Sequence, residues 1–136
     1  MSYLIDTSVI SELRKGKRCD PHVAAWFSDI GDDDIFLSVL TIGELRQRIE
    51  RIKRRQSKKA VELDSWLHTM LEAYEDRILP IDRSVAEEWG RMNFPDPLPA
   101  IDGLLAATAK IYGLCFVTRN TKDIARTGVT CLNPFS

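Results

Sequence analysis

The sequence predicts an α/β fold in which helices cover both faces of a central, mostly parallel sheet, giving a three-layer α/β/α sandwich. Short apolar runs typical of buried strands alternate along the chain with longer segments that repeat apolar residues at helical spacing. The 136 residues, 44% hydrophobic and 29% charged, have the composition of an ordinary globular domain, and they contain no internal repeat. We therefore expect residues 1–136 to form a single domain.

The first predicted strand is Tyr3–Asp6, an apolar run that ends in an acid, and a helix follows from about Ser8 to Arg14. A basic loop over residues 15–18 leads to Asp20-Pro21. Aspartate is a favoured N-cap residue and proline fits the first position of a helix, so we expect a second helix to begin there.

The second predicted strand, Ile35–Ser38, precedes two long helices. The first begins at about Thr41 and the second runs from about Ser57 to Glu75, and both repeat apolar residues at helical spacing. We expect these two helices to form a hairpin with an exposed, basic turn.

The C-terminal half continues the alternation of strands and helices. Its prolines exclude a helix between Phe94 and Pro99, which must be a loop. The other predicted elements are a strand at Ile78–Leu79, a helix over Val85–Arg91, a helix over Ala100–Tyr112, a strand at Cys115–Thr118 and a last strand at Thr130–Leu132.

Four acids stand where this fold would bring them to one edge of the sheet: Asp6, Glu44, Asp102 and Asp123. Each follows a predicted strand or opens a predicted helix, and in a parallel sheet these points share the carboxyl edge, where ligands bind. Clustered carboxylates repel one another unless a cation neutralises them. Carboxylate oxygens suit hard cations, so we expect a site for Mg²⁺ or Mn²⁺.

Each acid also has a structural explanation. Asp6 could cap the following helix, and Thr41 with Glu44 spells a capping box. Asp102 could complement a helix dipole, and Asp123 could make a turn or cap the residues after it. One shared metal site explains all four together. Neutral polar residues predicted beside the acids could orient a water or a phosphate, or merely finish strand ends: Thr7, Ser8, Thr118 and Asn120.

A basic block covers residues 46–59. It holds eight Lys or Arg residues and one acid, so it carries +7 while the rest of the chain carries −8. Such a block beside an acidic site could hold a polyanion, and a solvated helix face is the plainer alternative. The candidate contacts to such a polyanion or to a protein partner are Arg46, Arg48, Arg51, Arg54 and Arg55.

Four segments in series resemble the PIN domains of VapC toxins from bacterial toxin–antitoxin pairs. They are Leu4–Leu13 (LIDTSVISEL), Leu37–Leu45 (LSVLTIGEL), Pro99–Ala109 (PAIDGLLAATA) and Phe116–Asp123 (FVTRNTKD). The terminal Asn133–Phe135 is similar to the FitB-like branch of these toxins.

This resemblance implies a PIN fold and a Mg²⁺- or Mn²⁺-dependent endoribonuclease. It also implies a toxin homodimer that is neutralised, in a hetero-oligomer, by a small VapB-like antitoxin. The acids of the family match Asp6, Glu44, Asp102 and Asp123, and its accessory polar positions match Thr7 or Ser8, Thr118 and Asn120. The chain departs from the family at Ile124, where many relatives carry Phe, and at Arg48, where the family has a small residue.

Two other classes of function remain open. One is a non-catalytic subunit of a DNA-binding regulatory complex. The other is a phosphoacceptor domain, which is disfavoured because Asp6 is followed by Thr7 rather than by a second acid. The three cysteines show no C-x-x-C spacing, and no apolar run approaches the length of a membrane span. We therefore expect a cytoplasmic protein without membrane contact.

Overall fold

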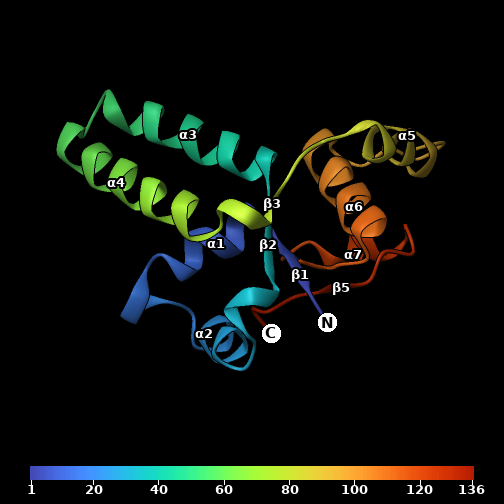
Figure 1. Ribbon diagram of the computed structural model, residues 1–136, viewed down its shortest axis with the longest axis horizontal. Coiled ribbons are helices and arrows are strands. Elements are labelled where there is room, and N and C mark those ends of the chain that lie inside the picture. Colours follow the sequence, from blue (N-terminus) through green and yellow to red (C-terminus); the bar gives the residue numbers. More distant parts are fainter.

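The computed structural model describes residues 1–136 and contains a five-stranded sheet in which every strand pair is parallel (Figure 1). The strand order β3-β2-β1-β4-β5 places β1 in the middle. From β1 the chain builds outward through β2 and β3, then crosses to the other side of β1 for β4 and β5, so the order reverses between β1 and β4. The strands are β1 (Tyr3–Ile5), β2 (Ile35–Ser38), β3 (Ile78–Leu79), β4 (Cys115–Val117) and β5 (Cys131–Leu132).

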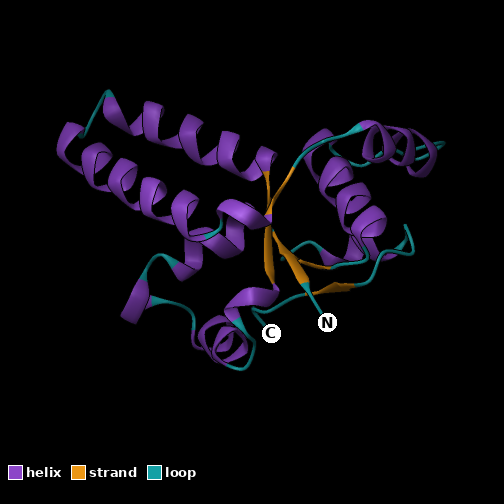
Figure 2. Ribbon diagram, viewed as in Figure 1, coloured by secondary structure: helices purple, strands orange, loops and turns teal.

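Helices cover both faces of the sheet, as the sequence predicts (Figure 2). Helices α1 to α4 pack on one face and α5 to α7 on the other, and α3 and α4 form the predicted hairpin. The helices are α1 (Thr7–Leu13), α2 (Pro21–Ser28), α3 (Val39–Lys53), α4 (Ser57–Ala73), α5 (Arg83–Met92), α6 (Ala100–Tyr112) and α7 (Thr121–Ala125). Three single turns of 3₁₀-helix are η1 (Gly16–Arg18), η2 (Asp32–Asp34) and η3 (Glu75–Arg77).

The strands alternate their side chains between the two layers. Leu4 pairs with Phe116 in the β1–β4 register, and both belong to the core beneath α6 and α7. Ile5 pairs with Val117 in the same register, and both belong to the core beneath α1 to α4. Because successive residues of a strand face opposite sides, the apolar runs in these strands supply both cores at once.

Helix α3 corrects one expectation. It begins at Val39, directly after β2, and Ser38 is its N-cap, with Ser38 Oγ accepting a hydrogen bond from the backbone N–H of Leu40 at 3.0 Å. The predicted capping box of Thr41 and Glu44 is therefore wrong, because both residues lie inside the helix. The Thr41 hydroxyl is buried and has no hydrogen-bond partner.

The segment after β4 corrects a second expectation. Asp123 is the third residue of the short helix α7. It therefore neither forms a turn nor caps the residues after it. A helix of five residues is too short to show an apolar period, which explains why the sequence did not predict it. At the other end of the chain, Asp6 does cap α1, as one of its structural explanations requires.

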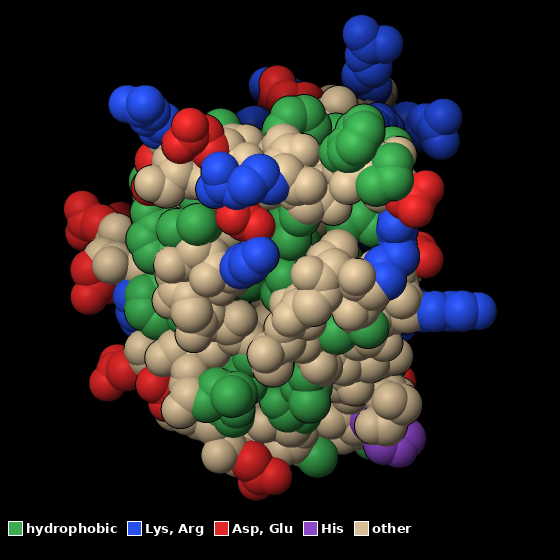
Figure 3. All heavy atoms as spheres, turned by 90° about the vertical axis from the view of Figure 1, so that its right-hand side faces the viewer, with side chains coloured by type: hydrophobic (Ala, Val, Ile, Leu, Met, Phe, Trp, Pro, Cys, Tyr) green, Lys and Arg blue, Asp and Glu red, His purple; other side chains and the backbone are tan.

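The side of the molecule formed by α5 to α7 mixes charged and apolar side chains at its surface (Figure 3). The large apolar residues that stay exposed in and between α5 and α6 are Trp89, Phe94, Ile111 and Tyr112. None of the helices combines the length and the apolar composition needed to cross a bilayer.

Candidate active site

The site lies where the strand order reverses, at the carboxyl ends of β1 and β4. Asp6 is the first residue after β1, and its backbone N–H donates to the carbonyl of Val117 at 3.0 Å. Thr118 is the first residue after β4, and its hydroxyl donates to Asp6 Oδ2 at 2.8 Å. In open α/β sheets this position is the usual place for a ligand crevice.

Three donors hold the Asp6 carboxylate. Besides Thr118, the backbone N–H of Thr7 donates to Oδ1 at 2.7 Å and the Ser8 hydroxyl lies 3.4 Å from Oδ2. Burial, the largest effect, raises the pKa of Asp6, and the charge of Glu44 raises it further. The hydrogen bonds from Thr118, Thr7 and Ser8 lower this pKa, but the net shift is upward. Asp6 is thus fixed in place and carries a charge that its surroundings disfavour.

Glu44 reaches the same edge from α3. The hydroxyl of Thr7 donates to Glu44 Oε1 at 2.5 Å, which connects the first turn of α1 to α3. Ser11 and Arg48 stand one helical turn further along α1 and α3, and Arg48 Nη1 donates to Ser11 Oγ at 2.5 Å. These two bonds link the helices side by side and set the position of Glu44 relative to Asp6.

Asp102 reaches the edge from the other layer. It is the third residue of α6, and Asn120 Nδ2 donates to its Oδ2 at 3.3 Å. Burial raises the pKa of Asp102, the bond from Asn120 lowers it, and the charges of Asp6 and Asp123 raise it further; the net direction is upward. The charge of Asp6 therefore acts on Asp102, although the two residues stand on different helices and far apart in the sequence.

Asp123 is the outermost of the four acids. Asp123 is exposed on α7, and its charge contributes to the raised pKa of Asp102. Hydrogen bonds thus join Asp6 to Glu44 through Thr7, and the segment after β4 contacts both Asp6, through Thr118, and Asp102, through Asn120. Ser8 also contacts Asp6, and Asp123 is linked to Asp102 only by the effect of its charge.

The side chains at this edge offer carboxylate, hydroxyl and amide oxygens as possible metal ligands, and hard cations prefer oxygen ligands. Asp6 and Asp102 are partly buried carboxylates that repel each other, a condition that a divalent cation relieves. No group of three or more His, Cys, Asp or Glu side chains is spaced to enclose an ion by itself. The oxygen chemistry of Asp6 and Asp102 suits a Mg²⁺ or Mn²⁺ ion, which takes one or two protein carboxylates and keeps several waters.

The arginines of the basic block divide into two groups. Arg46 Nη2 pairs with Asp64 Oδ1 on α4 at 2.8 Å, and Arg48 is bonded to Ser11, so both are engaged within the protein. Arg51, Arg54 and Arg55 are exposed near the end of α3, which puts Arg54 about 15 Å along the helix from Glu44.

The sequence analysis missed a second concentration of cations, in a cleft between the end of α1 and the start of α4. Arg14 and Arg18 meet Lys58 and Lys59 there. The sequence shows the two halves of this cleft only separately, as the basic loop after the first helix and as the end of the basic block, because the approach of α4 to that loop depends on tertiary packing.

Comparisons with known proteins match this chain over nearly its whole length. The model of the PIN domain family matches residues 3–129. Toxin FitB of Neisseria gonorrhoeae is 30% identical over 137 aligned residues, which cover 97% of each protein. VapC ribonuclease Y4jK of Sinorhizobium fredii is 29% identical, over 97% of this chain and 96% of that protein.

A solved structure, that of FitAcB from Neisseria gonorrhoeae, superimposes with a TM-score of 0.89 at 32% identity and covers 98% of both chains. Its fold agrees with the all-parallel sheet and the helices on both faces described above. Because the family model spans nearly the whole sequence and these relatives align from end to end, the chain belongs to the PIN-domain family.

Proposed function

We propose that this protein is a Mg²⁺- or Mn²⁺-dependent endoribonuclease that acts as the toxin of a toxin–antitoxin pair. The observation that carries the proposal is that the segment after β4 hydrogen-bonds both acids at the point where the strand order reverses: Thr118 donates to Asp6 and Asn120 donates to Asp102. Family membership and relatives named a toxin and a ribonuclease support a nuclease, which is a hydrolase.

Asp6 and Asp102 are the proposed metal ligands. When bound, the ion supplies Lewis-acid polarisation of the phosphate and of the attacking water. Glu44, oriented by Thr7, and Asp123, at the rim, either complete the ligand set or position that water. Thr118 and Asn120 donate to Asp6 and Asp102 and thereby hold the two carboxylates in the orientation that the ion requires.

A nuclease of this kind needs a partner that restrains it, so we propose a small VapB-like antitoxin and a hetero-oligomer formed from a toxin homodimer. RNA as the substrate places its action in the cytoplasm. A non-catalytic subunit of a DNA-binding complex is not favoured, because all four acids are present and a relative is named a ribonuclease.

The test is cleavage of total RNA with and without Mg²⁺ or Mn²⁺ by the wild type, by Asp6→Asn and by Asp102→Asn. Each substitution keeps the shape of the side chain and removes its charge. We expect each variant to lose at least about 100-fold in cleavage rate, since a charged ligand matters no less than the outer-shell groups whose loss costs 10- to 100-fold.

Asp29→Asn is the matched control, because Asp29 is an exposed acid at the end of α2, on a helix that carries none of the site residues. It should cleave like the wild type. Equal cleavage by all four proteins, or full cleavage in a chelator, contradicts the assigned site.

A further inference from the structure

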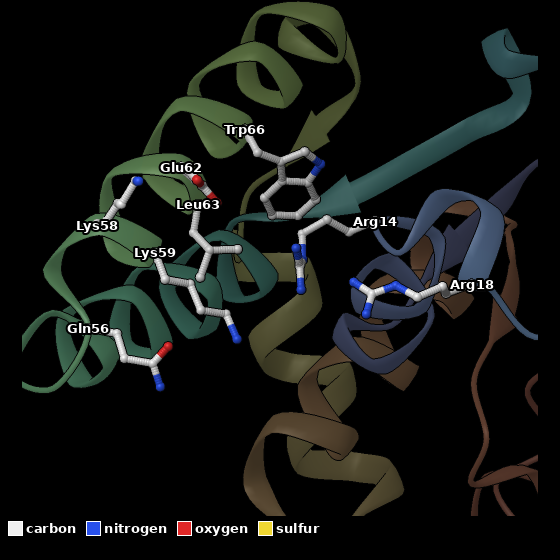
Figure 4. A pocket seen from close by; sticks show the side chains of 8 residues that line it. All are labelled: Arg14, Arg18, Gln56, Lys58, Lys59, Glu62, Leu63 and Trp66. Atoms are coloured by element: carbon white, nitrogen blue, oxygen red, sulfur yellow. The ribbon is translucent and has the colours of Figure 1, made fainter.

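The largest cleft of the protein lies away from the four acids, between the end of α1 with η1 on one side and the first half of α4 on the other (Figure 4). Its volume is about 700 Å³. Figure 4 shows the side chains of Arg14 and Arg18 extending from one wall and those of Lys59 and Trp66 from the other. The lining residues are Arg14, Arg18, Gln56, Lys58, Lys59, Glu62, Leu63 and Trp66.

The cleft carries four cations against one acid. Arg14, Arg18, Lys58 and Lys59 are all exposed, and none of them forms an ion pair within the protein. The amino end of α4 adds to this charge, because Gln56 offers no side-chain cap to the first backbone N–H groups of that helix. Such a concentration of unpaired positive charge fits a polyanion.

Trp66 gives the cleft an aromatic surface. One part of its ring packs against the core shared by α1 to α4, and the ring also borders the cleft beside Arg14. An indole held in this way is a platform on which an unpaired base can stack. A duplex keeps its bases stacked inside, so the combination of cations and indole fits a single strand better than a double one.

The cleft continues along α1 in the direction of the carboxylates. A smaller cavity of about 200 Å³ shares Arg14, Lys59 and Trp66 with the cleft and continues to Ser11 and Arg48. Ser11 and Arg48 are hydrogen-bonded to each other, one helical turn along α1 and α3 from the Thr7–Glu44 hydrogen bond. Along α1, Arg14 is about 10 Å from Thr7, a distance that a short strand can bridge.

We propose that this cleft binds single-stranded RNA and guides it to the carboxylate edge. Arg14, Arg18, Lys58 and Lys59 hold its phosphates, and a base stacks on Trp66. A docking site for an amphipathic helix needs a row of apolar anchors. The cleft itself offers only Leu63 and Trp66 among its eight lining residues, and the further apolar residues Leu45, Ile49 and Ile52 line the smaller cavity beside it. The proposal rests on the proposed function, because it names how the same substrate is held.

The test measures binding apart from cleavage. A short fluorescein-labelled single-stranded RNA is titrated in a chelator with the full chain, and anisotropy is followed over a range of salt concentrations. Arg18→Gln with Lys58→Gln removes two charges of the cleft. Lys17→Gln with Arg83→Gln removes two exposed charges that line no cavity, one beside Arg18 and one on α5 across the sheet.

The cleft variant should bind at least about tenfold more weakly at low salt, and its slope of log affinity against log salt should fall by about 1.4, since each phosphate contact on a single strand contributes about 0.7. The control should bind like the wild type. Trp66→Leu, which keeps an apolar group against the core, should weaken binding about five- to hundredfold. A thermal unfolding curve shows whether that variant is folded, and the charge variants decide the question if it is not.

The outcomes separate the two proposals. Weak binding by the cleft variant alone supports the cleft, even if the protein never cleaves RNA. Equal binding by cleft and control variants overturns it, as does the absence of RNA binding by a wild type that cleaves. Unchanged RNA binding with lost binding of the purified antitoxin would make the cleft a protein-docking surface and would also overturn the proposal.

Discussion

The carboxylate edge and the basic cleft lie at the two ends of α1, and they are built in opposite ways. At the start of the helix, Asp6 is its N-cap, partly buried and fixed by hydrogen bonds from Thr7, Ser8 and Thr118. At its end, Arg14 is the C-cap, exposed and free of ion pairs. The carboxylate edge is held by hydrogen bonds and carries charges that burial disfavours. The basic cleft is exposed, and its cations are unpaired.

This difference indicates a division of labour. Chemistry requires groups that are held in place before the substrate arrives, whereas a phosphate backbone can be gripped by flexible cations whose contribution depends on salt. Changes at the edge should therefore alter turnover and metal affinity, and changes in the cleft should alter RNA affinity and its salt dependence. The predictions below test this separation, beginning with the largest expected effect.

Thr118→Val should separate positioning from binding. Thr118 is buried, donates to Asp6 Oδ2 at 2.8 Å and accepts from the backbone N–H of Asn120 at 3.2 Å, and valine can do neither. Loss of such a supporting bond reduces metal affinity or activity about 10- to 100-fold. The measurement is the Mn²⁺ concentration for half-maximal cleavage, which should rise.

Thr118→Ser keeps the hydroxyl and should recover most of the activity. Binding of single-stranded RNA in a chelator should not change in either variant. If Thr118→Val left the Mn²⁺ requirement unaltered, the carboxylate edge would not be held by this bond in the way described.

The acid dependence of stability should distinguish the two regions next. The pKa values of Asp6 and Asp102 are raised in the folded protein, chiefly by burial, so the folded state binds protons more readily than the unfolded chain does. Their charged forms therefore oppose folding above the folded-state pKa values. As the pH falls through those values toward the unfolded-state ones, this opposition is relieved.

In the absence of divalent cations, Asp102→Asn should consequently unfold at a higher temperature than the wild type near neutral pH, and the advantage should shrink as the pH is lowered toward the ordinary range of aspartate. Thermal unfolding in a chelator at several pH values measures it. Asp29→Asn, the exposed control, should show no such trend. A wild type that is the more stable protein at neutral pH would contradict the repulsion between the carboxylates.

Thr41→Val is the smallest expected effect and tests the local structure of α3. The buried Thr41 hydroxyl has no partner, and an unsatisfied buried polar group costs about 1–3 kcal/mol, so valine of nearly the same shape should stabilise the protein by about 1 kcal/mol. If Thr41 were instead the N-cap of a capping box, the same substitution would destabilise the protein by about 1 kcal/mol. Chemical denaturation gives the sign directly.

Much of this architecture follows from sequence pattern. The apolar runs ending in Asp6 and Thr118 predict neighbouring strands of one parallel sheet, and the structure confirms that pairing. The same topology leads us to expect Asp6 and Asp102 at one edge. The start of α3 did not follow, because Ser38 and Thr41 are both good N-cap residues and nothing local shows that the helix begins without a loop after β2.

The basic cleft could not be predicted either, because its cations come from segments that are far apart in the sequence. Arg14 and Arg18 stand about forty residues before Lys58 and Lys59, and only the packing of α4 beside α1 brings them together. Spacing within a helix reports which face is apolar, but not which neighbour that face meets. The basic block predicted over residues 46–59 therefore includes Lys58 and Lys59 but not Arg14 and Arg18, and the structure engages two of its arginines, Arg46 and Arg48, with Asp64 and Ser11.

The central claim is that Asp6 and Asp102 share a divalent cation, and calorimetric titration of Mn²⁺ into the purified protein tests it most directly. The wild type should bind Mn²⁺ with measurable heat, Asp29→Asn should bind like the wild type, and Asp6→Asn and Asp102→Asn should each lose the binding. Identical binding by the wild type and both variants would contradict the account.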